Sequence, residues 1–432
     1  MPRHVIFLAV AVTLASGLFS FYVADHPRVD ARAYDRIAWN LAQGFGYVED
    51  VSMAETPAKD DAIIRVGPGY QFFLAGVYVM AGHQYWVVWL LHALLRGASV
   101  VLIYMIARQL FTSTRGAFLA ALFFGFSPDL IAVNAFLLTE TLFLFLLVFA
   151  IHMSLRYMAE PSHRGVLFAG SLWAFAILVR PVALLAFLIA LGSLIWRRAW
   201  KDAVILCIAP IIIVGLWSAY VTHRYNSFIL TTTAGGYDLW VGNNLDATGG
   251  FEKTPEIQSL RDTTHSVELE KISHKKYFEF LFDHPLRFIE LQFRKLSIYG
   301  NVVRPGGAWI GLYDHKLLLY FILAMSVAGN ILLFGVGIAG LLLLAEKSKN
   351  ALTRVFVAMA IAAPLGVIPI IVETRYRYPF FPFLAVGAAF FLTQKPINSK
   401  LLAKVLVVLG IFAMYDLWSN WAHLMQRLQG LF

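Results

Sequence analysis

The chain has 432 residues, of which 59% are hydrophobic and only 14% are charged. A soluble domain carries about 25% charged residues, so this composition excludes an ordinary soluble enzyme and indicates helices that face lipid. The net charge of +9 fits the enrichment of lysine and arginine in the cytoplasmic loops of membrane proteins, and we do not expect a nucleic-acid partner. The single cysteine, Cys207, excludes disulfides within the chain and thiolate metal clusters.

Eleven apolar runs are long enough to cross a bilayer, or nearly so. The first lies at the N-terminus, and its length predicts an uncleaved membrane span instead of a signal peptide. A twelfth run, 66–81, is interrupted early by two glycines and a proline. The eleven runs are 5–23, 86–107, 117–136, 137–155, 166–179, 182–196, 203–221, 317–345, 355–372, 379–393 and 401–418.

The basic residues of the connecting segments decide the predicted topology. Five of these segments together hold thirteen basic residues and three acids, and lysine and arginine accumulate on the cytoplasmic side. All five lie on that side together with Arg3 only if 66–81 does not cross the membrane. The sequence therefore predicts an all-α, polytopic membrane protein with a cytoplasmic N-terminus, about eleven transmembrane helices and a single domain over residues 1–432.

This topology places two long segments, 24–85 and 222–316, outside the cytoplasm. Within the second, the pattern from 284 to 299 predicts an interfacial amphipathic helix that leads into the next span. Every polar residue interpreted below as functional lies in these segments or in short external turns. Because the charge argument uses none of those residues, their position on one face independently supports an external site.

An acid close to a membrane exit is the first candidate for catalysis. Apolar residues recur at 34, 37, 38 and 41, which predicts a short amphipathic helix on the membrane surface. Asp30 precedes this pattern, where the helix dipole stabilises an anion, and it is the candidate general base. A helix cap or a solvated loop acid is the alternative role. Asp35 lies one position out of the apolar stripe and is interpreted as a supporting residue.

Three further charged residues interrupt apolar sequence at predicted external positions. Arg65 precedes a glycine-rich turn and is suited to bind a phosphate, or to cover apolar surface with its stem. Glu140 lies in the apolar stretch 137–142, where an acid is costly and therefore a functional candidate; a helix start capped by Thr139 is the alternative. Arg180 precedes a proline, and it needs a carboxylate such as Glu140, or a lipid phosphate, as its partner.

Two polar clusters follow later in the chain. The pair Asn243-Asn244 lies between glycines and beside aromatic residues, a combination that suits sugar hydroxyls and sugar rings, although an ordinary turn uses the same residue types. Glu373, Arg375 and Arg377 surround an external helix break. The two arginines form a basic patch that faces the acidic first loop, and both phosphate binding and ion pairing with Glu373 fit this pattern.

Six short motifs, in one order along nearly the whole chain, resemble bacterial GT-C glycosyltransferases, in particular the broad family around the protein O-mannosyltransferases and the lipid A aminoarabinose transferase. Each motif alone is weak, and it is their order that carries the resemblance. The chain is shorter than many members, and Ala31 follows Asp30 where several relatives carry a second acid. The six motifs are Asp30-x-x-x-Tyr34 with Gly44-x-Gly46-Tyr47, Arg65-x-x-Pro68-Gly69-Tyr70, Leu138-Thr139-Glu140, Arg180-Pro181, Gly242-Asn243-Asn244, and Arg375-Tyr376-Arg377-Tyr378-Pro379.

The resemblance implies an enzyme of the cell (inner) membrane that takes a sugar from a polyprenyl-phosphate donor. The sugar passes to a lipid, glycan or protein acceptor outside the cytoplasm. It also implies inversion at the anomeric carbon by an acid of the first external loop, a position that corresponds to Asp30. No cofactor is firmly implied, and the departure after Asp30 leaves the use of a divalent cation open. The residues expected to bind substrate are Tyr34, Asp35, Arg65, Glu140, Arg180, Asn243, Asn244, Glu373, Arg375 and Arg377.

Two other functions fit parts of the pattern. A flippase or transporter of polyprenyl-linked glycans needs polar residues along a path through the bundle, whereas the mid-span positions here are apolar. An O-antigen-type polymerase or ligase, with a diphosphate-linked donor, shares the external arginines but need not carry the Asp30 loop. The sequence motifs of nucleotide-driven transport and of common hydrolases are absent. The sequence therefore favours the glycosyltransferase.

Overall fold

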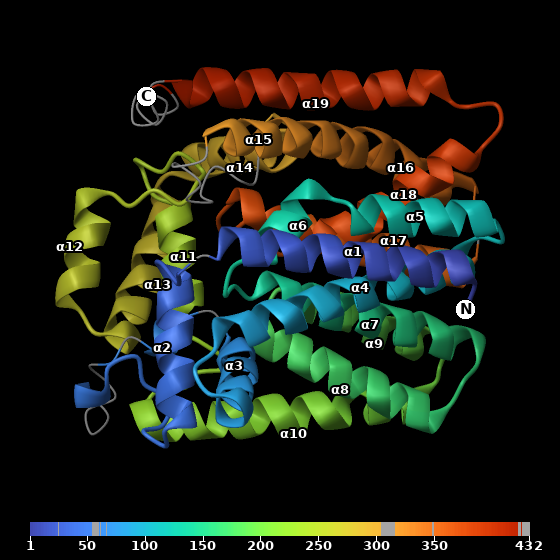
Figure 1. Ribbon diagram of the computed structural model, residues 1–432. Coiled ribbons are helices and arrows are strands. Elements are labelled where there is room, and N and C mark those ends of the chain that lie inside the picture. Colours follow the sequence, from blue (N-terminus) through green and yellow to red (C-terminus); the bar gives the residue numbers. More distant parts are fainter. Residues whose placement is uncertain are drawn as a thin grey trace.

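The computed structural model describes residues 1–24, 26–53, 60, 62–65, 67–303, 316–347, 350–421 and 425. These residues form helices and connecting turns, with no β-strand among them, as Figure 1 shows. The predicted all-α fold is confirmed.

Long apolar helices run side by side and form the body of the molecule (Figure 1). Among the described residues, six segments are long and apolar enough to cross a membrane, and four shorter apolar helices accompany them. The six are α1 (Arg3–Val23), α4 (Tyr85–Leu110), α7 (Glu140–Ala159), α10 (Trp200–Tyr225), the segment Leu317–Lys347, and α19 (Ser399–Ser419). The four are α5 (Thr114–Gly125), α8 (His163–Val179), α9 (Ala183–Trp196) and α17 (Ala351–Leu365). The chain is therefore a multi-pass membrane protein, while the count of eleven spans stays a prediction.

One predicted span is divided by a break, and another contains an irregular helical turn. The run 117–136 is split because α5 ends before Pro128, which begins the short helix α6 (Pro128–Val133). Proline lacks the amide hydrogen that would continue the preceding helix. The run 317–345 is continuous but contains a π-helical turn, η5 (Ile331–Val336), between α15 (Lys316–Asn330) and α16 (Gly337–Lys347). The almost completely buried α18 (Phe381–Thr393) packs against α16 and α5.

A group of shorter helices forms a cap at one end of the bundle. In Figure 1 the cap lies at the left, at the opposite end of α1 from the N-terminus. There α2 packs on α3 and α11 packs on α13, and the predicted amphipathic helices are present as α2 and α14. The cap helices are α2 (Asp30–Ala42), α3 (Pro68–Ala81), α11 (Ala234–Gly242), α12 (Pro255–Thr263), α13 (Ser266–Asp283) and α14 (Pro285–Gly300). Since α3 lies in this cap beside α2, its position supports the prediction that 66–81 does not cross the membrane.

The cap approaches the bundle most closely where α3 begins. A Cβ atom on Gly67 would lie 2.1 Å from the carbonyl oxygen of Leu178 and 2.7 Å from that of Val179, at the end of α8. Gly67 also has a φ of 20°, a conformation that residues with a side chain rarely adopt. The glycine therefore allows the backbone next to Arg65 to lie against the backbone next to Arg180.

We expect Gly67→Ala to destabilise the protein, because neither carbonyl oxygen at the end of α8 can move without moving the helix. Overpacking of this kind costs about 1–3 kcal/mol, which thermal unfolding in detergent would detect. Gly76→Ala is the matched control, since Gly76 lies in the same α3 helix and a Cβ there meets no atom within 4 Å. Equal melting temperatures for the two variants would contradict the close packing described here.

Candidate functional site

The candidate base, Asp30, is the first residue of α2, and the N-cap position is taken by Val29. The preceding Val29 has a φ of 47°, an outlier for a β-branched residue of the kind that concentrates at functional sites. An Arg375 guanidinium nitrogen lies 2.5 Å from Oδ2 of Asp30 and donates a hydrogen bond to it. Burial opposes ionisation of Asp30, but the charge and hydrogen bond of Arg375 bring its pKa below the usual value. Asp30 is thus a carboxylate at neutral pH.

Next to the Asp30–Arg375 pair, Glu140 and Arg180 continue a row of charges of alternating sign toward the bundle. Arg180 donates to Oε1 of Glu140 at 2.7 Å, and Nε of Arg375 lies 3.9 Å from the same oxygen. The ring of Tyr376 lies between the two guanidinium groups, 5.3 Å from Cζ of Arg180 and 5.6 Å from Cζ of Arg375. The predicted pairing of Arg180 with Glu140 is confirmed. Glu140 also begins α7, but Thr139 in the N-cap position makes no side-chain capping hydrogen bond, and its hydroxyl donates to Glu140 instead.

Arg65 is held by a partner that the sequence did not indicate. Its guanidinium donates two hydrogen bonds to the carboxylate of Glu49, at 2.9 and 3.0 Å. Such two-point geometry fixes the planar group as well as neutralising it. Arg65, Arg180 and Arg375 therefore each contact a carboxylate in this structure.

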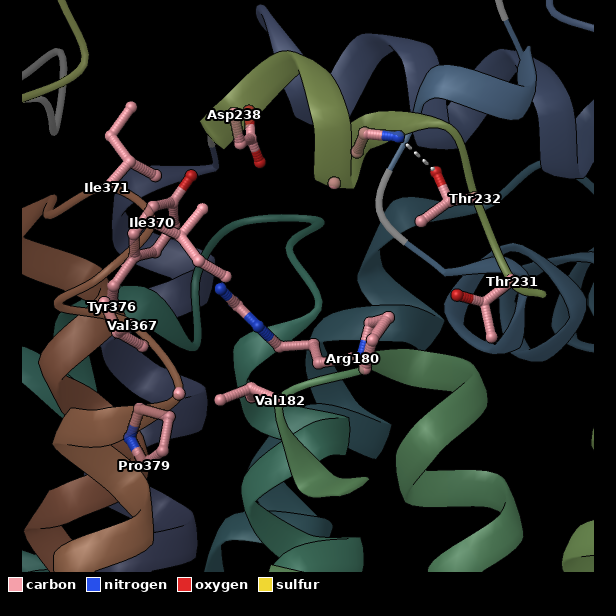
Figure 2. Close-up of a pocket in the computed structure, with 14 residues that line it drawn as sticks. Arg180, Val182, Thr231, Thr232, Asp238, Val367, Ile370, Ile371, Tyr376 and Pro379 are labelled. Atoms are coloured by element: carbon pink, nitrogen blue, oxygen red, sulfur yellow. Dashed lines mark hydrogen bonds between the residues drawn. The ribbon is translucent and has the colours of Figure 1, made fainter. Parts of the chain in front are cut away.

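Two adjoining pockets lie at this end of the bundle. The polar pocket has a volume of about 290 Å³ and the apolar pocket, drawn in Figure 2, about 210 Å³. Ala234, Asp238 and Tyr376 line both of them, so the two spaces share a wall. The charged residues of the polar pocket are Asp30, Arg65, Asp238, Lys253, Arg261, Glu373 and Arg375. The aliphatic and proline side chains of the apolar pocket are Pro181, Val182, Val367, Ile370, Ile371 and Pro379.

Two charged residues, Arg180 and Asp238, belong to the lining of the apolar pocket. Figure 2 shows Arg180 reaching into it from the turn between α8 and α9, and Asp238 pointing into it from α11. A mostly apolar slot with a cation in its lining suits a molecule with a hydrocarbon part and an anionic head, because each part meets its own kind of surface.

Three charged residues of the polar pocket, Asp238, Lys253 and Arg261, were missed in the sequence. Asp238 follows an aromatic residue in an otherwise apolar helix, and its isolation among such neighbours is a signal that could have found it. Lys253 forms no ion pair within the described residues, and its ammonium lies 5.8 Å from the centre of the Phe251 ring. Burial lowers the pKa of Lys253, and the nearby Arg261 and Arg65 lower it further. Nothing in the spacing of Lys253 distinguishes it from an ordinary loop lysine.

Several predicted residues are brought into the polar pocket, whereas Asp35 is not. Asp30, Tyr34, Arg65, Glu373 and Arg375 line this pocket. Within the described residues, Glu373 forms no ion pair. Thus the basic patch meets the first loop through Asp30 instead of pairing with its own neighbour.

Asp35 lies on another face of α2 and lines neither pocket. Its carboxylate accepts hydrogen bonds from Tyr78 at 2.6 Å and Tyr85 at 2.9 Å, and His83 lies 2.8 Å away. These partners come from the end of α3 and the start of α4. Asp35 therefore fastens α2 to the bundle, which is a supporting role, and the structure gives it no direct contact with a ligand space.

The side chains of Asn243 and Asn244 form hydrogen bonds within the protein. Nδ2 of Asn243 lies 2.8 Å from the carbonyl oxygen of Leu239 and 3.1 Å from that of Ile370, and the buried Lys295 donates to its Oδ1 at 2.7 Å. Asn244 likewise donates to main-chain oxygens of α11. These hydrogen bonds hold α11 in place. Contact of either asparagine with a sugar stays a prediction.

Arg377 is completely buried and lines neither pocket. It donates to the carbonyl oxygens of Asn301 at 2.6 Å and Thr374 at 3.2 Å, and its guanidinium lies over the ring of Phe334. The two arginines of the predicted basic patch therefore separate, because residues two apart in η6 (Thr374–Phe380) point in different directions. Only Arg375 reaches the pocket. Within the described part of the chain, no group of three or more His, Cys, Asp or Glu residues is placed to hold a metal ion.

Comparison with known proteins agrees with this architecture. Residues 65–221 match the family model described as dolichyl-phosphate-mannose-protein mannosyltransferase. The whole structure is similar to the crystal structure of ArnT from Cupriavidus metallidurans bound to undecaprenyl phosphate, with a TM-score of 0.56 and 14% sequence identity. The match covers 97% of this chain and 65% of that one. The chain has a GT-C fold.

A second GT-C structure, the apo form of the Archaeoglobus fulgidus oligosaccharyltransferase, gives a TM-score of 0.51 at 14% identity, over 95% of this chain and 55% of that one. The chain thus spans less than two thirds of the length of either protein. No protein with curated annotation matches the chain by sequence. The resemblance predicted from the six motifs is confirmed, and the segment matched by the family model contains Arg65, Glu140 and Arg180.

Proposed function

We propose that this GT-C protein is a glycosyltransferase that moves a sugar from a polyprenyl-phosphate donor to an acceptor hydroxyl on the extracytoplasmic face, with inversion. The observation that carries the proposal is the pair of adjoining pockets, one mostly apolar with Arg180 in its lining, the other polar and containing Asp30. A lipid-linked sugar has this same sequence of parts: a hydrocarbon chain, a phosphate and a hydroxyl-rich ring.

In this proposal the donor lies across both pockets. The isoprenoid units next to the phosphate occupy the apolar pocket, as supported by the likeness to an ArnT structure that contains undecaprenyl phosphate. The phosphate lies near the shared wall, within reach of Arg180 and Arg375, with Lys253 as a cation that has no carboxylate partner among the described residues. Cations placed in advance around a leaving phosphate stabilise the charge that develops on it.

The sugar and the acceptor hydroxyl then meet at Asp30 in the polar pocket. The hydroxyl oxygen forms a bond to the anomeric carbon as the bond from that carbon to the phosphate oxygen breaks, and Asp30 takes the hydroxyl proton. One displacement of this kind inverts the anomeric centre. Arg375 holds Asp30 in the ionised form that a base requires, and a phosphate that drew Arg375 away would make the carboxylate more basic.

The extracytoplasmic position of the site is supported by two independent observations. The pocket residues come from cap helices such as α2 and α11 and from turns such as 180–182 and 366–371 that meet them, and the cap lies at the end of α1 away from the N-terminus (Figure 1). The segments rich in basic residues connect helices at the opposite end of the bundle. For example, Arg156 and Arg164 lie between α7 and α8, whose other ends are at Glu140 and Val179, near the pockets. The positive-inside bias then assigns the cap to the outer side.

The test is transfer by the purified, detergent-solubilised protein. We expect release of polyprenyl phosphate when the protein receives a polyprenyl-phosphate sugar and a hydroxyl acceptor, with the opposite anomeric configuration in the product. A flippase would move the donor across vesicles without cleaving it, and a polymerase or ligase would act only on a diphosphate-linked donor. Either of these results would overturn the proposal.

A further inference from the structure

Asp238 is a carboxyl group that the proposed reaction has not yet used. It lies on α11 in the wall common to both pockets, and Figure 2 shows its side chain pointing into the apolar one. Its oxygens accept no hydrogen bond from any described residue. Its neighbours in the apolar pocket include Ala234, Ile370 and Ile371. A carboxyl group so placed faces the junction of the two pockets and is available to a ligand there.

The charges around Asp238 set it apart from Asp30. Burial, together with the negative charge of Asp30, raises the pKa of Asp238 to about 7, although Arg375, Arg180 and Lys253 act in the opposite direction. Asp30, in contact with Arg375, has its pKa lowered. The titratable and charged groups that line the two pockets with Asp238 are Asp30, Tyr34, Arg65, Arg180, Tyr237, Lys253, Arg261, Glu373, Arg375 and Tyr376.

We propose that Asp238 is the general acid of the transfer and gives its proton to the phosphate oxygen that leaves the anomeric carbon. This inference rests on the glycosyltransferase function proposed above. The acceptor proton goes to Asp30, the Asp238 proton goes to the departing phosphate, and the proton on Asp30 then returns to Asp238 through water. One proton thus passes in total from the acceptor to the polyprenyl phosphate, and both carboxyl groups are restored.

Two physical arguments favour the acid role over a purely structural one. An ionised Asp238 would repel the donor phosphate across the shared wall, whereas the protonated form can donate a hydrogen bond to it. In addition, the second pKa of a phosphate monoester is about 6, close to that of Asp238, so a shared proton moves between the two with little cost. Two carboxyl groups whose environments push their pKa values apart are the usual arrangement for a base and an acid in one site.

The decisive experiment compares Asp238→Asn with the wild type over a range of pH. Asparagine keeps the shape and the hydrogen-bond donor but has no proton to transfer. We expect kcat near neutral pH to fall about 10- to 100-fold, a modest loss for a general acid because phosphate is already a good leaving group. The decline of wild-type kcat above about pH 7, where Asp238 loses its proton, should be absent in the variant. The donor KM should change little.

Two further variants make the result unambiguous. Asp246→Asn is the matched control, because Asp246 lies in the loop that follows α11 and lines neither pocket; it should keep both kcat and the pH profile. Asp238→Glu keeps an acid in the pocket and should keep the alkaline decline, even if Asp238→Asn proves unstable. An Asp238→Asn variant with normal kcat, or with only a lowered donor KM, would overturn the acid role. A wild type that transfers no sugar would instead overturn the proposed function.

Discussion

Asp30→Asn is expected to lower kcat for sugar transfer by about 10²- to 10⁴-fold, the range measured for loss of a general base. Asparagine has the size of aspartate but cannot accept the acceptor proton. The change also removes the carboxylate that holds Arg375 at 2.5 Å, so the guanidinium becomes free to contact the donor phosphate. We therefore expect the donor KM to stay unchanged or to fall, while kcat collapses. Steady-state kinetics with a polyprenyl-phosphate sugar measures both quantities.

The matched control for this variant is Asp50→Asn. Asp50 lies in the segment between α2 and α3, is exposed, and its carboxylate accepts hydrogen bonds from the backbone and the hydroxyl of Ser52. Its loss should leave transfer unchanged. A folded Asp30→Asn protein with transfer close to that of the wild type would contradict the assignment of the base. A variant with a raised donor KM and normal kcat would show that Asp30 only organises the pocket.

The parts of the fold that follow from local sequence and charge were predictable. The spacing of apolar residues predicted the amphipathic helix α2. The bias of basic residues predicted that the segments 24–85 and 222–316 share one face, and both contribute helices to the cap. Glu140 and Arg180 could be paired because each is a charge in an apolar setting that needs a partner. Such arguments need no knowledge of which helices pack together.

The roles of the asparagine pair and of Arg377 could not be predicted in the same way. Polar amides between glycines are typical of sugar sites and of internal hydrogen bonding alike, and only the position of 369–371 decides between them. A Cβ on Gly242 would lie 2.1 Å from the carbonyl oxygen of Ile370, so the glycine and Asn243 together dock α11 against that segment. Arg377 points away from Arg375 because of the local helix geometry of η6, which the sequence does not specify.

Asp238 escaped the sequence analysis for a different reason. Its significance depends on the wall between two pockets, to which α11 contributes Ala234 and Asp238 and the distant η6 contributes Tyr376. A single acid in an otherwise apolar helix of nine residues marks Asp238 as unusual, but the sequence does not show that it lies between two pockets. Burial and the proximity of Asp30 are properties of the folded chain, and they are what raise its pKa. Functional acids of this kind are found by their environment.

The ion pair between Glu140 and Arg180 provides the second large expected effect. The side chain of Glu140 is 3% exposed and that of Arg180 is 12% exposed. Glu140→Gln leaves Arg180 without its nearby carboxylate in a mostly buried setting, and breaking a buried pair on one side costs about 3–5 kcal/mol. We expect a correspondingly large fall in the free energy of unfolding in detergent, and a weaker hold on the Arg375 side chain that faces Asp30.

A double-mutant cycle separates this pairing from other effects of the substitutions. The double variant Glu140→Gln with Arg180→Gln has neither charge, so no buried charge is left unpaired. Its loss of unfolding free energy should therefore be smaller than the sum of the two single losses, by a coupling energy of about 0.5–3 kcal/mol. The internal control is Glu160→Gln at the end of α7, where the pair with Arg156 is exposed and 3.6 Å long and should contribute well under 1 kcal/mol. If Glu140→Gln were no more destabilising than Glu160→Gln, the buried Glu140–Arg180 pair would not be a stabilising contact between the start of α7 and the end of α8.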